Sequence, residues 1–358
     1  MHFYAHSLPL DIEIRIPAPI IVPLLEVGAQ LQLPPVITYS DNVFYNWALK
    51  VPSVEPIPAF DNLRTLTMFT GTRDEEEFYL TSTRIELRGV DALEVMRVTM
   101  DELFIGDALA VCRITRYLHS LARVVDDLAR LLLSVRDGCD PDIFYHSIRP
   151  WFNGADLDSR RWNFEGIDAH PELVLPDELS GPSAAQSPLI HALDLFLGVD
   201  HASSPSSSPI MEHAAASAHV PPRAPFLARM RAYMPRLHRD FLRYLAAAPR
   251  PLREAVVRTG KAPLTDAYNA ALSALRGLRD AHLRIVTLYI IGPSHRAPSA
   301  SHARTLAKGA VKDCFAEKTG MSQSLLRGTG GTVLIQFLKS VRERTSEAVV
   351  ELDDGTIT

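Results

Sequence analysis

The stretch TDAYNAALSALRGLRDAHLRIVTLYI, residues 265–290, carries the longest helical pattern of the chain. Side chains three and four residues apart share one face, which consists of Ala271, Leu275, Leu278, His282, Ile285 and Tyr289. We expect Thr265 to cap this helix, Asp266 to favour the dipole of its first turn, and Gly292-Pro293 to end it. The pattern predicts a buried helix with a single histidine in its apolar face.

That histidine, His282, has two interpretations. An imidazole among apolar side chains needs a partner, because burying an unpaired polar group costs free energy. It is either a core histidine bonded to a carbonyl or carboxylate, or an axial ligand of haem iron inside a helical pocket. Spacing alone leaves both interpretations open.

Apolar periodicity predicts further helices over much of the chain, at 22–32, 84–136, 183–198, 225–247, 250–258 and 332–350. A helix also begins near residue 141, residues 62–82 are ambiguous between strand and helix, and 153–182 are predicted to be loop. The segments 202–224 and 293–328 are predicted to be flexible loops. Helices dominate and strands are scarce, so the predicted fold class is mainly α.

Composition excludes several classes of protein. The 358 residues are 47% hydrophobic and 22% charged, as in globular proteins, and the net charge of −5 gives no indication of a nucleic acid or membrane partner. Three cysteines without a CxxC motif exclude a disulfide framework and a zinc ribbon. The N-terminus lacks the basic and apolar regions of a signal peptide. We expect a cytoplasmic protein and a monomer.

Two further motifs could carry chemistry. Gly328-Thr329-Gly330-Gly331-Thr332 is either a flexible loop before the last helix or a loop that closes on a small polar ligand. Arg149 in FYHSIRPWF is either a surface ion-pair residue or a carboxylate clamp. On an α-helix, Phe144 and Arg149 would lie about 140° apart and could both flank a pocket. No hydrolase motif of the GxSxG or HExxH type is present.

Seven segments in order resemble the indoleamine 2,3-dioxygenase family of haem enzymes. They are LPPVITYSDNVFYNW (33–47), FYLTS (78–82), FYHSIR (144–149), GPSAAQS (181–187), RAYMPRLHRDFL (231–242), LRDAHLRIVTLYII (278–291) and RGTGGTVLIQFLKSVR (327–342). The last three are specific to the family. The resemblance covers most of the chain and favours the haem interpretation of the histidine in the long helix.

On the haem side, the resemblance implies roles for five residues. His282 corresponds to the proximal ligand of the iron of haem b, and Asp194 to the carboxylate that polarises this imidazole. Arg279 corresponds to the residue that pairs with a haem propionate, and Ser183 and Ala184 line the haem edge.

On the substrate side, the implied catalytic residues are Phe78 and Ser82 over the iron, Phe144 near the substrate ring, Arg149 on its carboxylate and Thr329 on its ammonium group. The implied pocket for the indole ring consists of Tyr39, Asn42, Val43 and Tyr79. Asn42 stands where the family often has a smaller, less polar residue, and Tyr79 adds a hydroxyl. Both positions are therefore candidates for a changed substrate preference.

The implied activity is insertion of O2 across the indole C2–C3 bond of L-tryptophan to give N-formylkynurenine, a step of tryptophan catabolism and NAD biosynthesis. It needs an electron donor that keeps the haem iron ferrous. The pocket would position the substrate and exclude water rather than supply a general base. The alternative is a non-catalytic or altered-substrate haem-binding relative.

Two departures from the family motivate this alternative. Residues 1–32 are expected to be a remnant of a small N-terminal domain with its linker, and 33–358 the large α-helical catalytic domain. Removing 310–328 would restore the family motif Ala-Lys-Gly-Thr-Gly-Gly-Thr, so we interpret that segment as a retained intron or a gene-model error.

Overall fold

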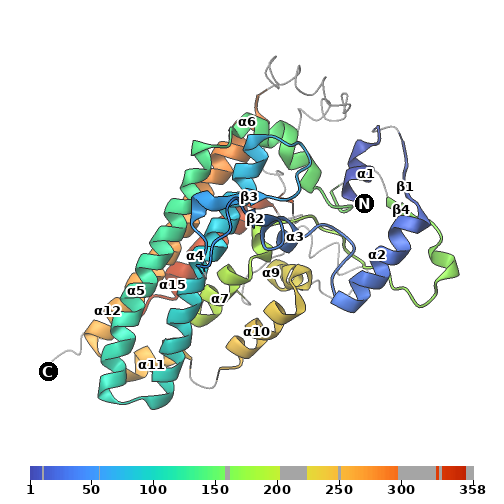
Figure 1. Ribbon diagram of the computed structural model, residues 1–358. Helices are drawn as coiled ribbons and strands as arrows, with labels where there is room; N and C mark the ends of the chain where they lie inside the picture. Colours follow the sequence, from blue (N-terminus) through green and yellow to red (C-terminus); the bar gives the residue numbers. More distant parts are fainter. Residues whose placement is uncertain are drawn as a thin grey trace.

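The computed structural model describes residues 1–9, 12–55, 57–157, 162–201, 224–248, 251–296, 328–329 and 333–351. The predicted mainly-α class is confirmed (Figure 1). The helices are α1 (His2–Ser7), α2 (Ala18–Leu31), α3 (Tyr39–Val43), α4 (Arg73–Ile105), α5 (Ala108–Leu133), α6 (Pro141–Ile143), α7 (Pro188–Phe196), α9 (Phe226–Met230), α10 (Arg236–Ala246), α11 (Leu252–Thr259), α12 (Ala262–Val286), α13 (Gly292–Ser294) and α15 (Leu334–Glu347). The strands are β1 (Ile14–Ile16), β2 (Trp47–Leu49), β3 (Leu63–Thr65) and β4 (Trp162–Phe164).

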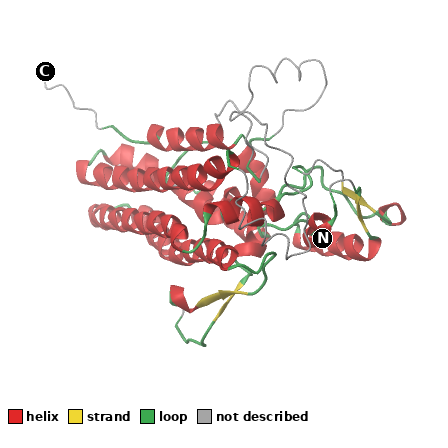
Figure 2. Cartoon of the chain, turned by 90° about the horizontal axis from the view of Figure 1, so that it is seen from above, coloured by secondary structure: helices red, strands yellow, loops and turns green. Residues whose placement is uncertain are grey.

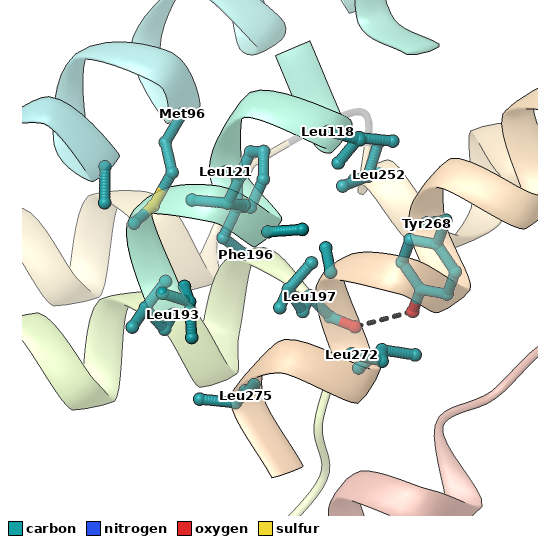
Figure 3. Packing of buried hydrophobic residues seen from close by; sticks show 14 of the residues in the cluster. Met96, Leu118, Leu121, Leu193, Phe196, Leu197, Leu252, Tyr268, Leu272 and Leu275 are labelled. Carbon is teal, nitrogen blue, oxygen red and sulfur yellow. Dashed lines mark hydrogen bonds between the residues drawn. The ribbon is translucent and has the colours of Figure 1, made fainter. Parts of the chain in front are cut away.

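The long helices α4, α5 and α12 lie side by side in a bundle, and α15 packs along α12 (Figures 1 and 2). Their apolar faces meet α7 and α11 in one buried cluster. Figure 3 shows its centre, with Met96, Leu118, Leu121, Leu193, Phe196, Leu197, Leu252, Tyr268, Leu272 and Leu275. Because this cluster is close-packed, it holds the ends of the long helices in fixed positions.

Local signals set the ends of the α4–α5 hairpin. The Thr72 hydroxyl accepts a hydrogen bond from the Glu75 amide and caps the start of α4. Gly106 ends α4 with φ at +69°, a left-handed conformation that glycine adopts without strain. The Asp107 carboxylate then accepts from the Ala110 amide and caps α5. The two helices are therefore joined by a tight turn and pack antiparallel.

The N-terminal segment forms a small apolar cluster of its own. β1 pairs in parallel with β4, and α1 and α2 pack beside this pair (Figure 1). The prediction of loop throughout 153–182 is wrong at β4. Three residues carry too little local pattern to predict a strand, and Trp162–Phe164 becomes one because β1 supplies its hydrogen bonds.

The predicted ends of the longest helix are also wrong. α12 begins at Ala262 after Lys261, with a proline in its first turn, so Thr265 is an internal residue and its hydroxyl is buried rather than capping. Its backbone continues through a π-helical segment, Thr287–Ile291, into α13 beyond Gly292. Tertiary packing therefore overrides the local stop signal.

Other predicted elements are confirmed with shifted ends. The ambiguous stretch 62–82 divides into β3 and the start of α4, and 225–247 is interrupted before Pro235 into α9 and α10. The predicted loops 202–224 and 293–328, and the interpreted intron 310–328, lie almost entirely outside the described residues. Within the described ranges, no helix is both long enough and apolar enough to cross a bilayer.

Candidate active site

A cavity at one end of the bundle is lined by residues of α4 and α12. It holds about 1230 Å³ of space between atoms, part of it open to solvent. Walls are added by α3, by the turns Phe144–Ile148, Arg149–Phe152 and Ala184–Gln186, and by α15. The predicted site residues that line it are Tyr39, Asn42, Val43, Phe78, Tyr79, Ser82, Phe144, Arg149, Ser183, Ala184, His282 and Thr329. Asp194 and Arg279 do not line it.

His282 lies on the predicted face of α12 and lines the cavity together with Ile285 and Tyr289. Within the described part of the chain, its imidazole has no hydrogen-bond partner, so the core-histidine interpretation lacks the carbonyl or carboxylate it requires. Burial lowers the pKa of His282 to about 4, so the imidazole is neutral at pH 7 and keeps a free lone pair. A neutral, unpartnered imidazole facing a large cavity has the chemistry of an axial haem ligand.

One turn before this histidine, Arg279 takes part in a buried ion pair. Its guanidinium donates to the Asp194 carboxylate and to the Val341 carbonyl, the latter at 3.1 Å. The His201 imidazole contacts the other carboxylate oxygen of Asp194 at 2.9 Å. Burial would raise the pKa of Asp194, but the charge of Arg279 and the bond to His201 outweigh it and hold the pKa below its ordinary value. Among the described contacts of Asp194, none reaches His282 directly.

Aromatic rings form the wall opposite α12. The Phe78 ring lies 4.6 Å from that of Phe144 and 5.7 Å from that of Phe152, measured between centroids. Tyr289 meets Phe144 edge-on at 5.7 Å. Phe152 was not among the predicted residues, because nothing in its sequence context distinguishes it from a core residue. The rings make an apolar slot suited to a flat, aromatic occupant.

Phe144 and Arg149 come together because the backbone between them is π-helical. The Arg149 amide donates to the Phe144 carbonyl, a bond that spans five residues, so the separation of about 140° expected on an α-helix does not apply. Both side chains line the cavity. The Arg149 guanidinium lies 5.5 Å from the Tyr145 ring centroid, and burial lowers its pKa while leaving it cationic. A cation thus stands beside an apolar slot.

Hydrogen bonds fix α3 against the rest of the cavity wall. The Tyr39 hydroxyl donates to Glu86 at 2.9 Å, and the Ser187 hydroxyl donates to the same carboxylate oxygen at 2.6 Å. The Gln186 side-chain carbonyl accepts from the Tyr39 amide at 2.9 Å. Burial raises the pKa of Glu86 to about 7. Sequence reasoning missed Glu86, although it follows Ser82 by one helical turn.

The hydroxyl of Tyr79 turns away from the cavity. It donates to the buried Glu75 carboxylate at 3.1 Å, which also accepts from the Phe69 and Thr70 amides at 2.7 and 2.6 Å. Tyr79 therefore presents its ring rather than its hydroxyl to the cavity.

Two glycines bring the remaining wall into place. A Cβ added to Gly181 would lie 1.8 Å from the Phe152 carbonyl oxygen, and one added to Gly154 would lie 2.0 Å from that of Leu179. Only glycine allows the two backbones to cross this closely. The crossing positions Pro182, whose carbonyl accepts a hydrogen bond from the Thr329 hydroxyl at 2.7 Å. The rest of the glycine-rich motif, 330–332, lies outside the described residues.

The sequence profile of the indoleamine 2,3-dioxygenase family matches residues 1–348. The chain belongs to this family of oxidoreductases. It is 31% identical to indoleamine 2,3-dioxygenase 1 of Mus musculus, over 95% of this chain and 74% of the mouse protein. It is 32% identical to indoleamine 2,3-dioxygenase of Saccharomyces cerevisiae, over 96% of this chain and 74% of the yeast protein. It is also 27% identical to 6-hydroxytryptophan 2,3-dioxygenase of Fusarium equiseti, over 94% and 75% of the two chains.

Proposed function

We propose that this chain is a haem-dependent dioxygenase that inserts O2 across the indole C2–C3 bond of L-tryptophan or a related indole amino acid. Tryptophan would give N-formylkynurenine. The observation that carries the proposal is the cavity itself, in which a neutral histidine, without a hydrogen-bond partner among the described residues, faces the same space as an arginine and an aromatic wall. The names of the relatives, which include one for 6-hydroxytryptophan, support an indole amino acid as the substrate class.

The residues present fit haem b. His282 would ligate the iron, and Ser183 and Ala184 would contact the haem. The resemblance assigns Arg279 to a haem propionate, but its guanidinium bonds to Asp194 and Val341 and it does not line the cavity, so the geometry supports the histidine ligand and not the propionate contact. When bound, haem supplies the iron that binds and activates O2, provided that an electron donor keeps it ferrous.

The other lining residues would hold the substrate and keep water out. Arg149 would pair with its carboxylate and Thr329 would contact its ammonium group, which sets the position of the indole ring. The Tyr39, Tyr79 and Tyr289 hydroxyls each bond to protein acceptors, so their rings extend the apolar slot without adding free donors. No carboxylate is among the described lining residues, which suits positioning rather than base catalysis.

The test is to reconstitute the full chain with haem and to measure two signals. The absorption spectrum of the reduced form reports histidine ligation, and N-formylkynurenine formation from L-tryptophan under O2 reports turnover. We expect both signals from the unmodified chain, and the loss of both from His282→Ala. His119→Ala, on an exposed face of α5, is the matched control and keeps both.

The outcomes distinguish the proposal from its alternative. A histidine-ligated spectrum without product from any indole amino acid would indicate a non-catalytic haem-binding relative. Normal haem binding by His282→Ala would overturn the ligand assignment. An Arg149→Ala variant should weaken tryptophan binding by about 2–4 kcal/mol, because the carboxylate would lose a desolvated cation.

A further inference from the structure

Asn42 is an unusual polar residue in the cavity wall. It lies on α3, only 6% of it is exposed, and it lines the cavity. In the described part of the chain, its side-chain amide has no hydrogen-bond partner. The amide atoms are not fully enclosed by protein, so they contact the cavity, and an amide offers two donors and two acceptor lone pairs to an occupant.

Two neighbouring polar side chains, Tyr39 and Tyr79, have hydrogen-bond partners in the protein. Tyr39 is bonded to Glu86 and Tyr79 to Glu75, so neither hydroxyl is directed to an occupant. Ser82 has no hydrogen-bond partner among the described residues either, but a serine hydroxyl on a helix can rotate to bond a carbonyl of its own preceding turn. Asn42 therefore differs from Tyr39 and Tyr79, because its amide remains available to an occupant of the cavity.

The position of α3 along α4 shows which part of an occupant Asn42 would meet. The Thr83 hydroxyl donates to the Val43 carbonyl, and Tyr39 bonds to Glu86, so α3 lies beside residues 83–86 of α4. The Phe152 ring packs instead on Phe78 and Tyr79, so Phe152 lies at that level, three residues after Arg149 in the same 3-10 segment.

These two levels are about 9 Å apart along α4 at about 1.5 Å of rise per residue. This separation is comparable with the length of an indole amino acid. Arg149 and Asn42 both line the cavity, so an occupant of this length whose carboxylate pairs with Arg149 can reach Asn42 with the far edge of its ring.

We infer that Asn42 is a specificity-determining residue that hydrogen-bonds a hydroxyl group on the benzo ring of the substrate. The inference rests on the proposed function and names its substrate class, tryptophan hydroxylated on the six-membered ring. The benzo edge of tryptophan itself carries only C–H groups and leaves the amide unpaired. A hydroxyl on the ring both donates and accepts a hydrogen bond, so it pairs with the amide. A substrate that carries this hydroxyl is therefore favoured over one that carries a hydrogen atom at the same ring position.

The experiment compares L-tryptophan, 5-hydroxy-L-tryptophan and 6-hydroxy-L-tryptophan on the haem-reconstituted chain and on two variants. Asn42→Leu removes the amide at nearly constant size, and Asn42→Ser keeps a hydrogen-bonding group. We measure kcat/KM for each substrate, and Kd from the change that substrate binding causes in the haem absorption spectrum. For one of the two hydroxylated substrates, the kcat/KM ratio to tryptophan should fall about tenfold in Asn42→Leu and less in Asn42→Ser.

A second measurement does not need haem. Because Asn42→Leu replaces an amide in a largely apolar wall by an apolar group of similar size, the haem-free variant should unfold at a denaturant midpoint no lower than that of the unmodified chain. If tryptophan is turned over but the substrate ratios are the same in Asn42→Leu, the inference is wrong and the proposed function stands. If none of the three substrates binds the reconstituted, unmodified chain, the proposed function fails and the inference fails with it.

Discussion

In its N-terminal half, α12 packs Tyr268, Leu272 and Leu275 into the bundle with at most 1% of any of them exposed (Figure 3). In its C-terminal half, the same helical face presents His282 and Ile285 to a cavity. The apolar pattern is continuous across both halves. The two halves differ in what faces them. Leucines of α5 pack against the N-terminal half of α12, whereas short irregular turns border the space beside its C-terminal half.

The backbone differs as well. The two π-helical segments, Phe144–Ile148 and Thr287–Ile291, lie against each other at the cavity end, where the Tyr289 hydroxyl donates to the Cys139 carbonyl at 2.6 Å. An i→i+5 turn re-aims side chains that a regular α-helix would direct elsewhere. The comparison teaches that regular packing builds the bundle, while departures from regularity keep one end of it open.

The largest expected effect lies at the junction between the two halves. Arg279→Leu leaves the Asp194 carboxylate buried without its main counter-charge, and we expect a loss of about 3–5 kcal/mol in the free energy of unfolding. Urea unfolding of the haem-free protein measures it. The double variant Arg279→Leu/Asp194→Leu is the control and should recover part of the loss. An unchanged stability in the single variant would show that the two halves are not coupled through this pair.

A matched pair of truncations tests the packing difference directly. Leu275→Ala creates a void in the close-packed half and should cost about 3 kcal/mol. Ile285→Ala should cost less than about 1 kcal/mol, because its side chain already borders open space. Both values come from denaturant unfolding without haem. Equal losses would contradict the contrast between the two halves.

A smaller effect depends on pH and on the polar attachment of α3. The folded-state pKa of Glu86, about 7, lies above the ordinary 4.5, so the unfolded chain ionises first as pH rises. The stability contribution of the protonated carboxyl is complete below pH 4.5 and is lost by about pH 7. Glu86→Gln cannot ionise, so its stability relative to the unmodified chain should increase by roughly 2 kcal/mol across this window.

The control for this pH dependence is Glu343→Gln, at an exposed position of α15. It should follow the pH profile of the unmodified chain. If Glu86→Gln does the same, the Glu86 carboxyl does not stay protonated on folding.

Much of the bundle was predictable because its signals are local and repeated. The face that contains Leu275 and His282 follows from three- and four-residue spacing, and it is buried or cavity-lining as expected. The ends of α12 were not predictable, since Pro263 is compatible with a first turn and the packing of the π segment carries the chain past Gly292. β4 was missed because its partner lies about 150 residues away in the sequence.

The candidate site likewise contains residues that could be identified from the sequence and residues that could not. The resemblance to the family identified the side chains that line the cavity, including Arg149 and Thr329. It did not identify Glu86 or Glu75, whose importance depends on tyrosine hydroxyls that reach them only in the folded chain. It also could not show that Tyr79 has a hydrogen-bond acceptor while Asn42 has none within the described residues.

The way in which α3 is attached has a consequence for motion. Hydrogen bonds to Glu86, Gln186 and Thr83 hold this short helix, and it contributes nothing to the buried apolar clusters of the described chain. A segment held in this manner detaches at a lower free energy than a core helix does. The amide protons of α3 should exchange with deuterium through local opening, whereas those in the first half of α12 should exchange only through global unfolding. The wall beside Asn42 can thus loosen and re-form many times within the lifetime of an intact bundle.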